Sequence, residues 1–196
     1  MIDMDLYLRE QIKMILREPI ESDDTKVQRR MRWLKAAEIA VKGWSGDIVE
    51  IGALAGETTA LLCPLAEAYG RKVLVIDPWL APTHDVAGWE HAVFMTRTKT
   101  WRKNGVLEVI KDISQKPEHI RRLANERWAF ALVDGSHEHN DAFCDLMAVR
   151  HAVVIAVDDM DKPGIRLAYD KALAMMPERE GVFDENIAWK WEGYIV

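Results

Sequence analysis

Residues 47–59 read DIVEIGALAGETT, and the interpretation of the whole chain starts from this stretch. An apolar run passes into a turn that holds Gly52 and Gly56, and Thr58 and Thr59 follow where a helix would begin. Glycine lets backbone approach a ligand closely, and the free N–H groups of a helix start point at whatever the turn holds. The stretch therefore predicts a strand, a binding turn and a helix, although it matches neither G-x-G-x-x-G nor a P-loop.

Four further apolar runs follow at intervals long enough for helices: 72–77, 106–111, 128–134 and 152–158. Several are apolar at consecutive positions, as is typical of strands covered on both faces. Strands that alternate with helices predict an α/β fold with a doubly wound, mainly parallel sheet.

Helices and a hairpin are expected at the two ends of the chain. Apolar residues at spacings of three and four predict helices over 26–42 and 163–176. A further helix is expected over 4–17, so residues 1–44 form a helical extension before a core of 45–196, all in one domain. Residues 181–196 predict a terminal antiparallel hairpin. The basic run KVQRRMRWLK, which begins at Lys26, is expected on the solvated faces of its helix.

Composition excludes several classes of protein. The 196 residues are 49% hydrophobic and carry a net charge of −6, so a disordered chain is excluded and nucleic acid or anionic membrane is not an expected partner. Cys63 and Cys144 are expected to be free thiols. The first ten residues lack an apolar signal core. We expect a cytoplasmic protein, and a homo-oligomer is compatible with the sequence.

Acidic residues lie at the ends of four predicted strands: Glu50, Asp77, Asp134 and Asp158. In open α/β sheets, ligands bind beyond the carboxyl ends of the strands. Asp77 lies roughly 25 residues after Gly52, near the spacing at which an acid accepts hydrogen bonds from ribose hydroxyls. The sequence thus predicts a nucleoside site but contains no phosphate-binding loop. As the ligand of such a site, S-adenosylmethionine is favoured over NAD or ATP.

The motifs together resemble the class I S-adenosylmethionine-dependent methyltransferases, which have a Rossmann-like fold. The resemblance is greatest to the small metal-dependent O-methyltransferases and their cephalosporin-hydroxylase-like relatives. It rests on five segments in order: VEIGALAGETTALL, VLVIDPW, VIKDISQ, FALVDGSHEHNDAFCDL and VVIAVDD. It implies that Glu50, Gly52, Gly56 and Asp77 serve the cofactor, that Asp112 and Ile113 lie beside adenine, and that a small-molecule hydroxyl accepts the methyl group.

Asp134, Asp158 and Asp159 end neighbouring strands in this fold and should meet near the glycine turn. Three like charges in one cleft raise one another's pKa values, and a divalent cation removes that cost. All-oxygen ligands suit Mg²⁺, Ca²⁺ or Mn²⁺. The resemblance implies the same three residues as metal ligands.

His137 is the candidate general base, because histidine titrates near neutral pH and stands where catechol-type relatives carry a lysine. Its alternative role is to cap a helix or to orient a metal ligand. His137, His139 and Asp141 also resemble part of a zinc-hydrolase signature, although its last histidine is replaced by Ala142. A third hypothesis is a cofactor-binding subunit without catalysis.

Overall fold

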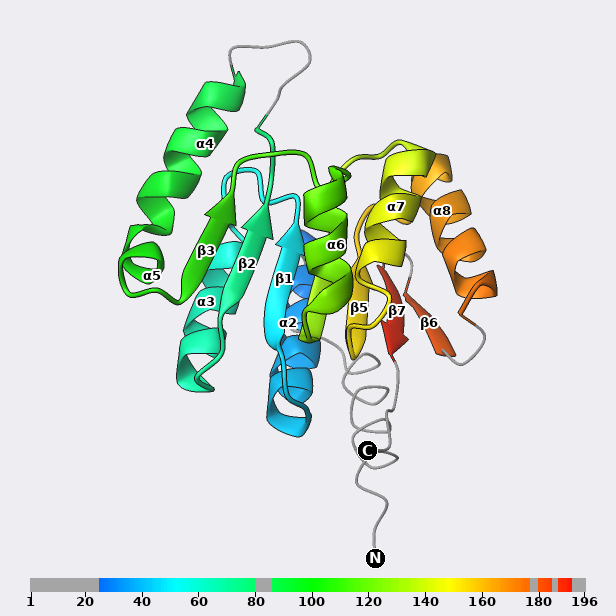
Figure 1. The fold of residues 1–196 in the computed structure, drawn as a ribbon, viewed down its shortest axis with the longest axis horizontal. Coiled ribbons are helices and arrows are strands. Elements are labelled where there is room, and N and C mark those ends of the chain that lie inside the picture. The colour runs from blue at the N-terminus through cyan, green and yellow to red at the C-terminus, as the bar shows by residue number, and fades with distance from the viewer. Residues whose placement is uncertain (1–24, 80–85, 177–179, 185–186, 192–196) are drawn as a thin grey trace, which may run out of the picture.

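Seven strands form one sheet in the order β3-β2-β1-β4-β5-β7-β6 (Figure 1). The computed structural model describes residues 25–79, 86–176, 180–184 and 187–191. The strands are β1 (Asp47–Ile51), β2 (Val73–Ile76), β3 (Leu107–Ile110), β4 (Trp128–Val133), β5 (Val154–Val157), β6 (Glu180–Asp184) and β7 (Ile187–Trp191). The first five are parallel, whereas β7 runs antiparallel to both β5 and β6. The predicted doubly wound sheet with a terminal hairpin is confirmed.

Continuous apolar runs form the centre of the sheet because both of its faces are covered. Every residue of β2, β4 and β5 is buried. Alternate residues of each strand then enter different cores: Ile48 packs on one side of the sheet, and Val49 and Ile51 pack on the other. This alternation follows from the pleat of a strand.

Helices cover both faces. They are α2 (Thr25–Gly43), α3 (Thr59–Ala68), α4 (Val86–Arg97), α5 (Lys99–Lys103), α6 (Pro117–Asn125), α7 (His139–Ala148) and α8 (Pro163–Ala174). The first core draws on α2, α3 and α4, and the second on α6, α7 and α8. In Figure 1, α6 and α7 lie in front of the sheet and α2 and α3 behind it. No helix among the described residues is long and apolar enough to cross a membrane.

Helix α2 confirms the helix expected over 26–42 and packs in the first core through Trp33, Ala37 and Ala40. The helix expected over 4–17 lies outside the described residues. The division of the chain into an extension and a core stays a prediction.

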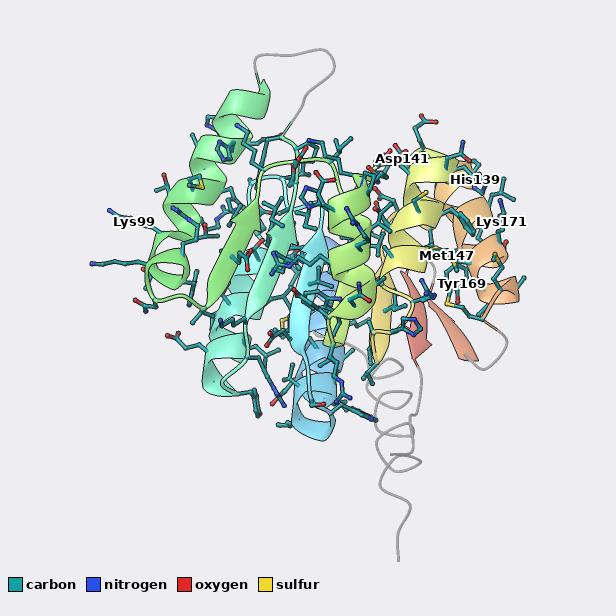
Figure 2. All side chains as sticks on the ribbon, in the orientation of Figure 1. Lys99, His139, Asp141, Met147, Tyr169 and Lys171 are labelled. Carbon is teal, nitrogen blue, oxygen red and sulfur yellow. The ribbon has the colours of Figure 1, made fainter. Side chains whose placement is uncertain are left out.

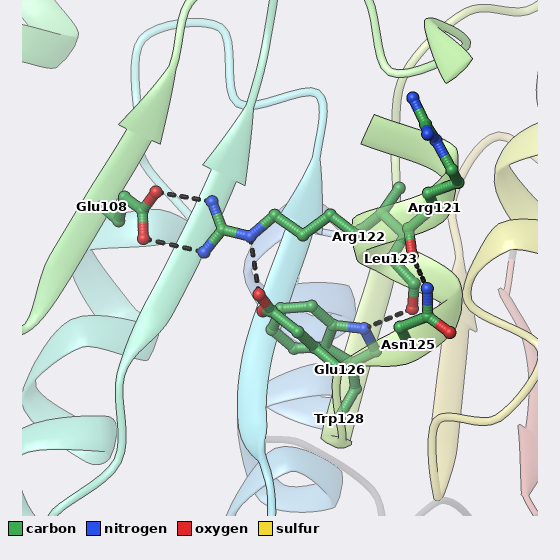
Figure 3. Close-up of polar contacts among 7 residues, drawn as sticks. All are labelled: Glu108, Arg121, Arg122, Leu123, Asn125, Glu126 and Trp128. Atoms are coloured by element: carbon green, nitrogen blue, oxygen red, sulfur yellow. Dashed lines mark hydrogen bonds and ion pairs between the residues drawn. The ribbon is translucent and has the colours of Figure 1, made fainter. Parts of the chain in front are cut away.

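A polar cluster fastens α6 to the sheet (Figure 3). The Arg122 guanidinium donates to both carboxylate oxygens of Glu108 on β3, at 2.5 and 2.8 Å, and to Glu126 at 2.8 Å. The Trp128 indole N–H donates to the carbonyl of Leu123 at 2.8 Å. A bidentate pair is directional, so this cluster fixes the C-terminal half of α6 against β3.

We expect Leu132→Ala to lower the free energy of unfolding by about 2–5 kcal/mol, because it empties part of a close-packed core. Leu132 is fully buried in β4. Urea denaturation followed by circular dichroism measures the change. Leu167→Ala is the control: its side chain is 58% exposed on α8, so its effect should stay within about 0.5 kcal/mol. Equal losses in the two variants would contradict the assigned core.

Candidate functional site

A pocket of about 830 Å³ opens beyond the carboxyl ends of β1, β2, β4 and β5. Strand β1 lies between β2 and β4, so the chain winds from it to both sides of the sheet, and ligands bind at such a point. Seven of the residues singled out in the sequence line this pocket: Gly52, Asp77, Ile113, Asp134, His137, Asp158 and Asp159. Glu50, Gly56 and Asp112 do not belong to its lining.

The glycines of the turn after β1 allow close approach between parts of the chain. A Cβ on Gly52 would lie 2.0 Å from the carbonyl oxygen of Asp134, and one on Gly56 would lie 2.6 Å from Phe94. Both glycines have positive φ, +85° and +74°, which favours glycine sterically. The sequence suggested that these glycines make room for a ligand, and the structure shows that both also make room for the chain itself.

Asp77 holds this turn against the end of β2. One of its carboxylate oxygens accepts from the backbone N–H groups of Ala53 at 2.7 Å and Leu54 at 2.9 Å. The other accepts from the N–H of Trp79 at 2.6 Å. An ionised carboxylate offers about four acceptor positions, so the chain uses three and one is left for a ligand.

Backbone strain gathers at the pocket. Among the described residues, those other than glycine with positive φ are Leu54 at 45°, Trp79 at 46° and Asp159 at 53°, and all three line the pocket. Such conformations cost free energy and persist where the surrounding structure enforces them. Here the Trp79 indole N–H donates to the carbonyl of Leu54 at 2.7 Å, which ties two of the strained residues together.

Asp134, Asp158 and Asp159 meet at the other side of the pocket. Each offers a carboxylate oxygen, and these oxygens lie within 4.8 Å of one another. Removal from water and the neighbouring carboxylates raise the pKa of Asp134 well above its ordinary value. Burial also raises the pKa of Asp158, against the opposing effects of the Asp159 backbone N–H and of Arg29. The negative charges of the three carboxylates are therefore not fully balanced by neighbouring positive charges.

Two side chains contact the trio, and one of them, Arg29, carries a positive charge. Arg29 Nη1 lies 2.7 Å from Asp158 Oδ1, and His137 Nε2 lies 2.6 Å from Asp159 Oδ2. The Asp158 Oδ1 atom also accepts from the N–H of Asp159 at 2.6 Å. One oxygen of Asp158 is thus engaged by the chain itself.

The expectation that the charges of the basic run face solvent is wrong for Arg29 and Arg30, which line the pocket together with Trp33. Arg30 forms an ion pair with Glu57 in the glycine turn. The Arg29 guanidinium lies 5.4 Å from the centroid of a Trp33 ring. Helical periodicity indicated which face of α2 is buried. It did not indicate that the first turns of this helix lie beside the carboxylates of the pocket.

Glu50 lies inside β1 and is 1% exposed. Its carboxylate accepts from the hydroxyl of Thr59 at 2.5 Å. Burial raises the pKa of Glu50 to about 8, against the hydrogen bond from Thr59. Glu50 therefore ties β1 to the start of α3, behind the pocket rather than in it.

In the loop after β3, Asp112 does not line the pocket, whereas the three residues that follow it do. Asp112 pairs with Lys116 at 2.6 Å and His119 at 3.2 Å, and the hydrogen bond from Lys116 lowers the pKa of Asp112 to about 2. Ile113 lines the pocket, and so do Ser114 and Gln115, which sequence reasoning did not select. Only their position directly after Ile113 in VIKDISQ pointed to them.

The zinc-hydrolase hypothesis required His137, His139 and Asp141 as ligands. His139 and Asp141 both lie near the start of α7, at the end of the sheet where the strand arrows point (Figure 2). In the part of the chain that the structure describes, the residues close enough to share a metal ion are Asp134, Asp158 and Asp159, and separately Asp112, Glu118 and His119. Neither group contains the zinc signature.

A family model described as a methyltransferase domain matches residues 49–160, which is more than half of the chain. The chain belongs to this methyltransferase family, and its fold is that of the class I S-adenosylmethionine-dependent enzymes. No curated protein matches it by sequence.

Solved structures share the fold at low sequence identity. CalS11, a TDP-rhamnose 3′-O-methyltransferase of calicheamicin biosynthesis, is 16% identical with a TM-score of 0.62, over 96% of this chain and 94% of that one. An O-methyltransferase from Bacillus cereus in complex with S-adenosylhomocysteine is 15% identical with a TM-score of 0.57, over 96% and 90%. The S-adenosylhomocysteine-bound methyltransferase PaMTH1 from Podospora anserina is 13% identical with a TM-score of 0.54, over 98% and 89%.

We expect Glu50→Gln to gain stability relative to the wild type as pH rises from about 5 to 8. In this range the unfolded chain ionises Glu50, whose ordinary pKa is 4.5, while the folded protein keeps it protonated up to about pH 8. The contribution of this group to wild-type stability therefore falls by up to about 1.4 kcal/mol per pH unit, and glutamine removes that loss. Urea denaturation of both proteins at several pH values tests this, and parallel curves would contradict it.

Proposed function

We propose that the protein transfers the methyl group of S-adenosylmethionine to a hydroxyl group of a small molecule, assisted by a divalent cation such as Mg²⁺. One observation carries the proposal: the turn held by Asp77 and the carboxylates of Asp134, Asp158 and Asp159 open into the same pocket. O-methyltransferases among the structures with this fold support the choice of a hydroxyl.

In this proposal the cofactor lies along the ends of β1 and β2. The remaining acceptor position of Asp77 serves the ribose hydroxyls, Gly52 borders the cofactor, and the half-exposed Ile113 offers an apolar surface to adenine. We assign Glu50, Gly56 and Asp112 to shaping these loops, because none of the three lines the pocket.

The carboxylate trio fits a divalent cation. Its donors are all oxygen atoms, which suits Mg²⁺ better than zinc, and their mutual repulsion is the cost that a cation removes. Asp134, Asp158 and Asp159 would hold it. A bound cation would make the acceptor hydroxyl more acidic.

His137 is proposed as the base. Its Nε2 faces the Asp159 carboxylate at 2.6 Å, so that nitrogen carries the hydrogen and Nδ1 is left to accept a proton. Asp159 would then stabilise the imidazolium that forms. The acceptor oxygen forms a bond to the methyl carbon as the carbon–sulfur bond breaks and the sulfur keeps the electron pair. S-adenosylhomocysteine remains, and the protein's main task is to hold the reactants in line.

We expect Asp77→Asn to bind S-adenosylhomocysteine about tenfold more weakly, because it loses acceptor capacity for the turn and the ribose. Isothermal titration with the 2′-deoxy analogue separates the two roles. The wild type should prefer the normal ligand, and the variant should not distinguish the two. Asp141→Asn removes a carboxylate from the same pocket and should keep the preference. A preference that survives in Asp77→Asn would refute the ribose contact.

Calorimetry with Mn²⁺ tests the metal. The wild type should bind one ion, and the double variant Asp158→Asn/Asp159→Asn should bind it at least about tenfold more weakly, since two of three oxygen donors lose their charge. Asp141→Asn is again the control and should bind normally. EDTA should abolish turnover of the wild type without unfolding it. A wild type that binds S-adenosylhomocysteine but no divalent ion would remove the metal and favour either metal-free transfer or the non-catalytic binding subunit.

A further inference from the structure

Asp145 is a carboxylate in the core that the mechanism above does not use. It lies on α7 and is 1% exposed. Both of its oxygens lie 3.0 Å from the side-chain nitrogen of Gln115, and Ser114 also hydrogen-bonds to it. Burial raises the pKa of Asp145 to about 7, against these hydrogen bonds. An apolar residue would avoid the cost of burying this group, so core packing does not explain it.

The contacts of Asp145 reach two separate walls of the pocket. Ser114 and Gln115 line it after β3, and Asp134 and Gly135 line it after β4. A Cβ on Gly135 would lie 3.5 Å from Asp145 Oδ2 and 3.3 Å from Ile51, so the carboxylate packs directly against this second loop.

The sheet itself does not join these loops. Strands β3 and β4 are separated by β2 and β1, so no ladder of backbone hydrogen bonds joins them directly, and the loops that follow them extend beyond the sheet. Helix α6, which follows the first loop, packs against α7, and Asp145 on α7 adds a direct polar contact to Ser114 and Gln115 in that loop.

We propose that Asp145 is a positioning residue for the cofactor: it holds Ser114 and Gln115 at the pocket wall and fixes that wall relative to the backbone at Gly135. The inference rests on the proposed cofactor site. A residue that acts in this way raises affinity by preorganisation. Because the pocket wall is already ordered before the cofactor binds, binding loses less conformational entropy.

The test is the affinity for S-adenosylhomocysteine, measured by isothermal titration. Asp145→Ala should raise the dissociation constant about tenfold, the effect of losing one well-made polar anchor. Leu146→Ala is the matched control, because Leu146 is the next residue of α7 and is 2% exposed in the same core. It should lower the melting temperature but change the dissociation constant less than about twofold.

A double-mutant cycle shows whether Asp145 acts through its partners. In the background Ser114→Ala/Gln115→Ala, adding Asp145→Ala should cause no further loss of affinity, because the contacts are already gone. Should Asp145→Ala fail to fold, Asp145→Asn keeps the volume and one acceptor and should weaken binding about threefold.

Three results would overturn the inference: unchanged affinity in both Asp145 variants, an equal loss in Leu146→Ala, or full additivity in the cycle. A wild type that fails to bind S-adenosylhomocysteine would instead overturn the proposed function, and the inference with it.

Discussion

The close approach of two chain segments at Gly52 is the constraint on which the site depends. The turn after β1 passes so near the carbonyl of Asp134 that a single added carbon would lie 2.0 Å from it. Only glycine tolerates both this contact and the backbone conformation that produces it. Because of it, the turn anchored by Asp77 and the carboxylates at the ends of β4 and β5 open into one pocket rather than two.

The burial of carboxyl groups carries an electrostatic cost in this structure. Burial raises the pKa values of Glu50, Asp134, Asp145 and Asp158. Carboxylates that are protonated in the folded state near neutral pH lower stability as pH rises. Arg29 offsets part of the charge in the trio. A fold would not accumulate such groups for stability alone, and perturbed carboxylates in a pocket are typical of functional sites.

The two ends of the pocket are held in different ways. The Asp77 end is fixed by backbone hydrogen bonds and by strained residues, Leu54 and Trp79, that the surrounding packing enforces. The wall after β3 is separated from β4 by two strands, and the packing of α6 on α7 together with the hydrogen bond from Gln115 to Asp145 holds it in place. Preorganisation of this pocket is therefore partly a property of the sheet and partly a property of one helix pair.

The sequence by itself determined the strands, their parallel order and the edge of the sheet that carries the site. Apolar runs and helical periodicity are local signals, and strands of one direction must end at one edge. Seven of the ten selected residues line the pocket for this reason. Only the tertiary structure decided which side chains at that edge face the pocket. Arg29 and Gln115 reach it because helices pack at particular angles, while Glu50 and Asp112 turn away, and no periodicity in the chain encodes such distant contacts.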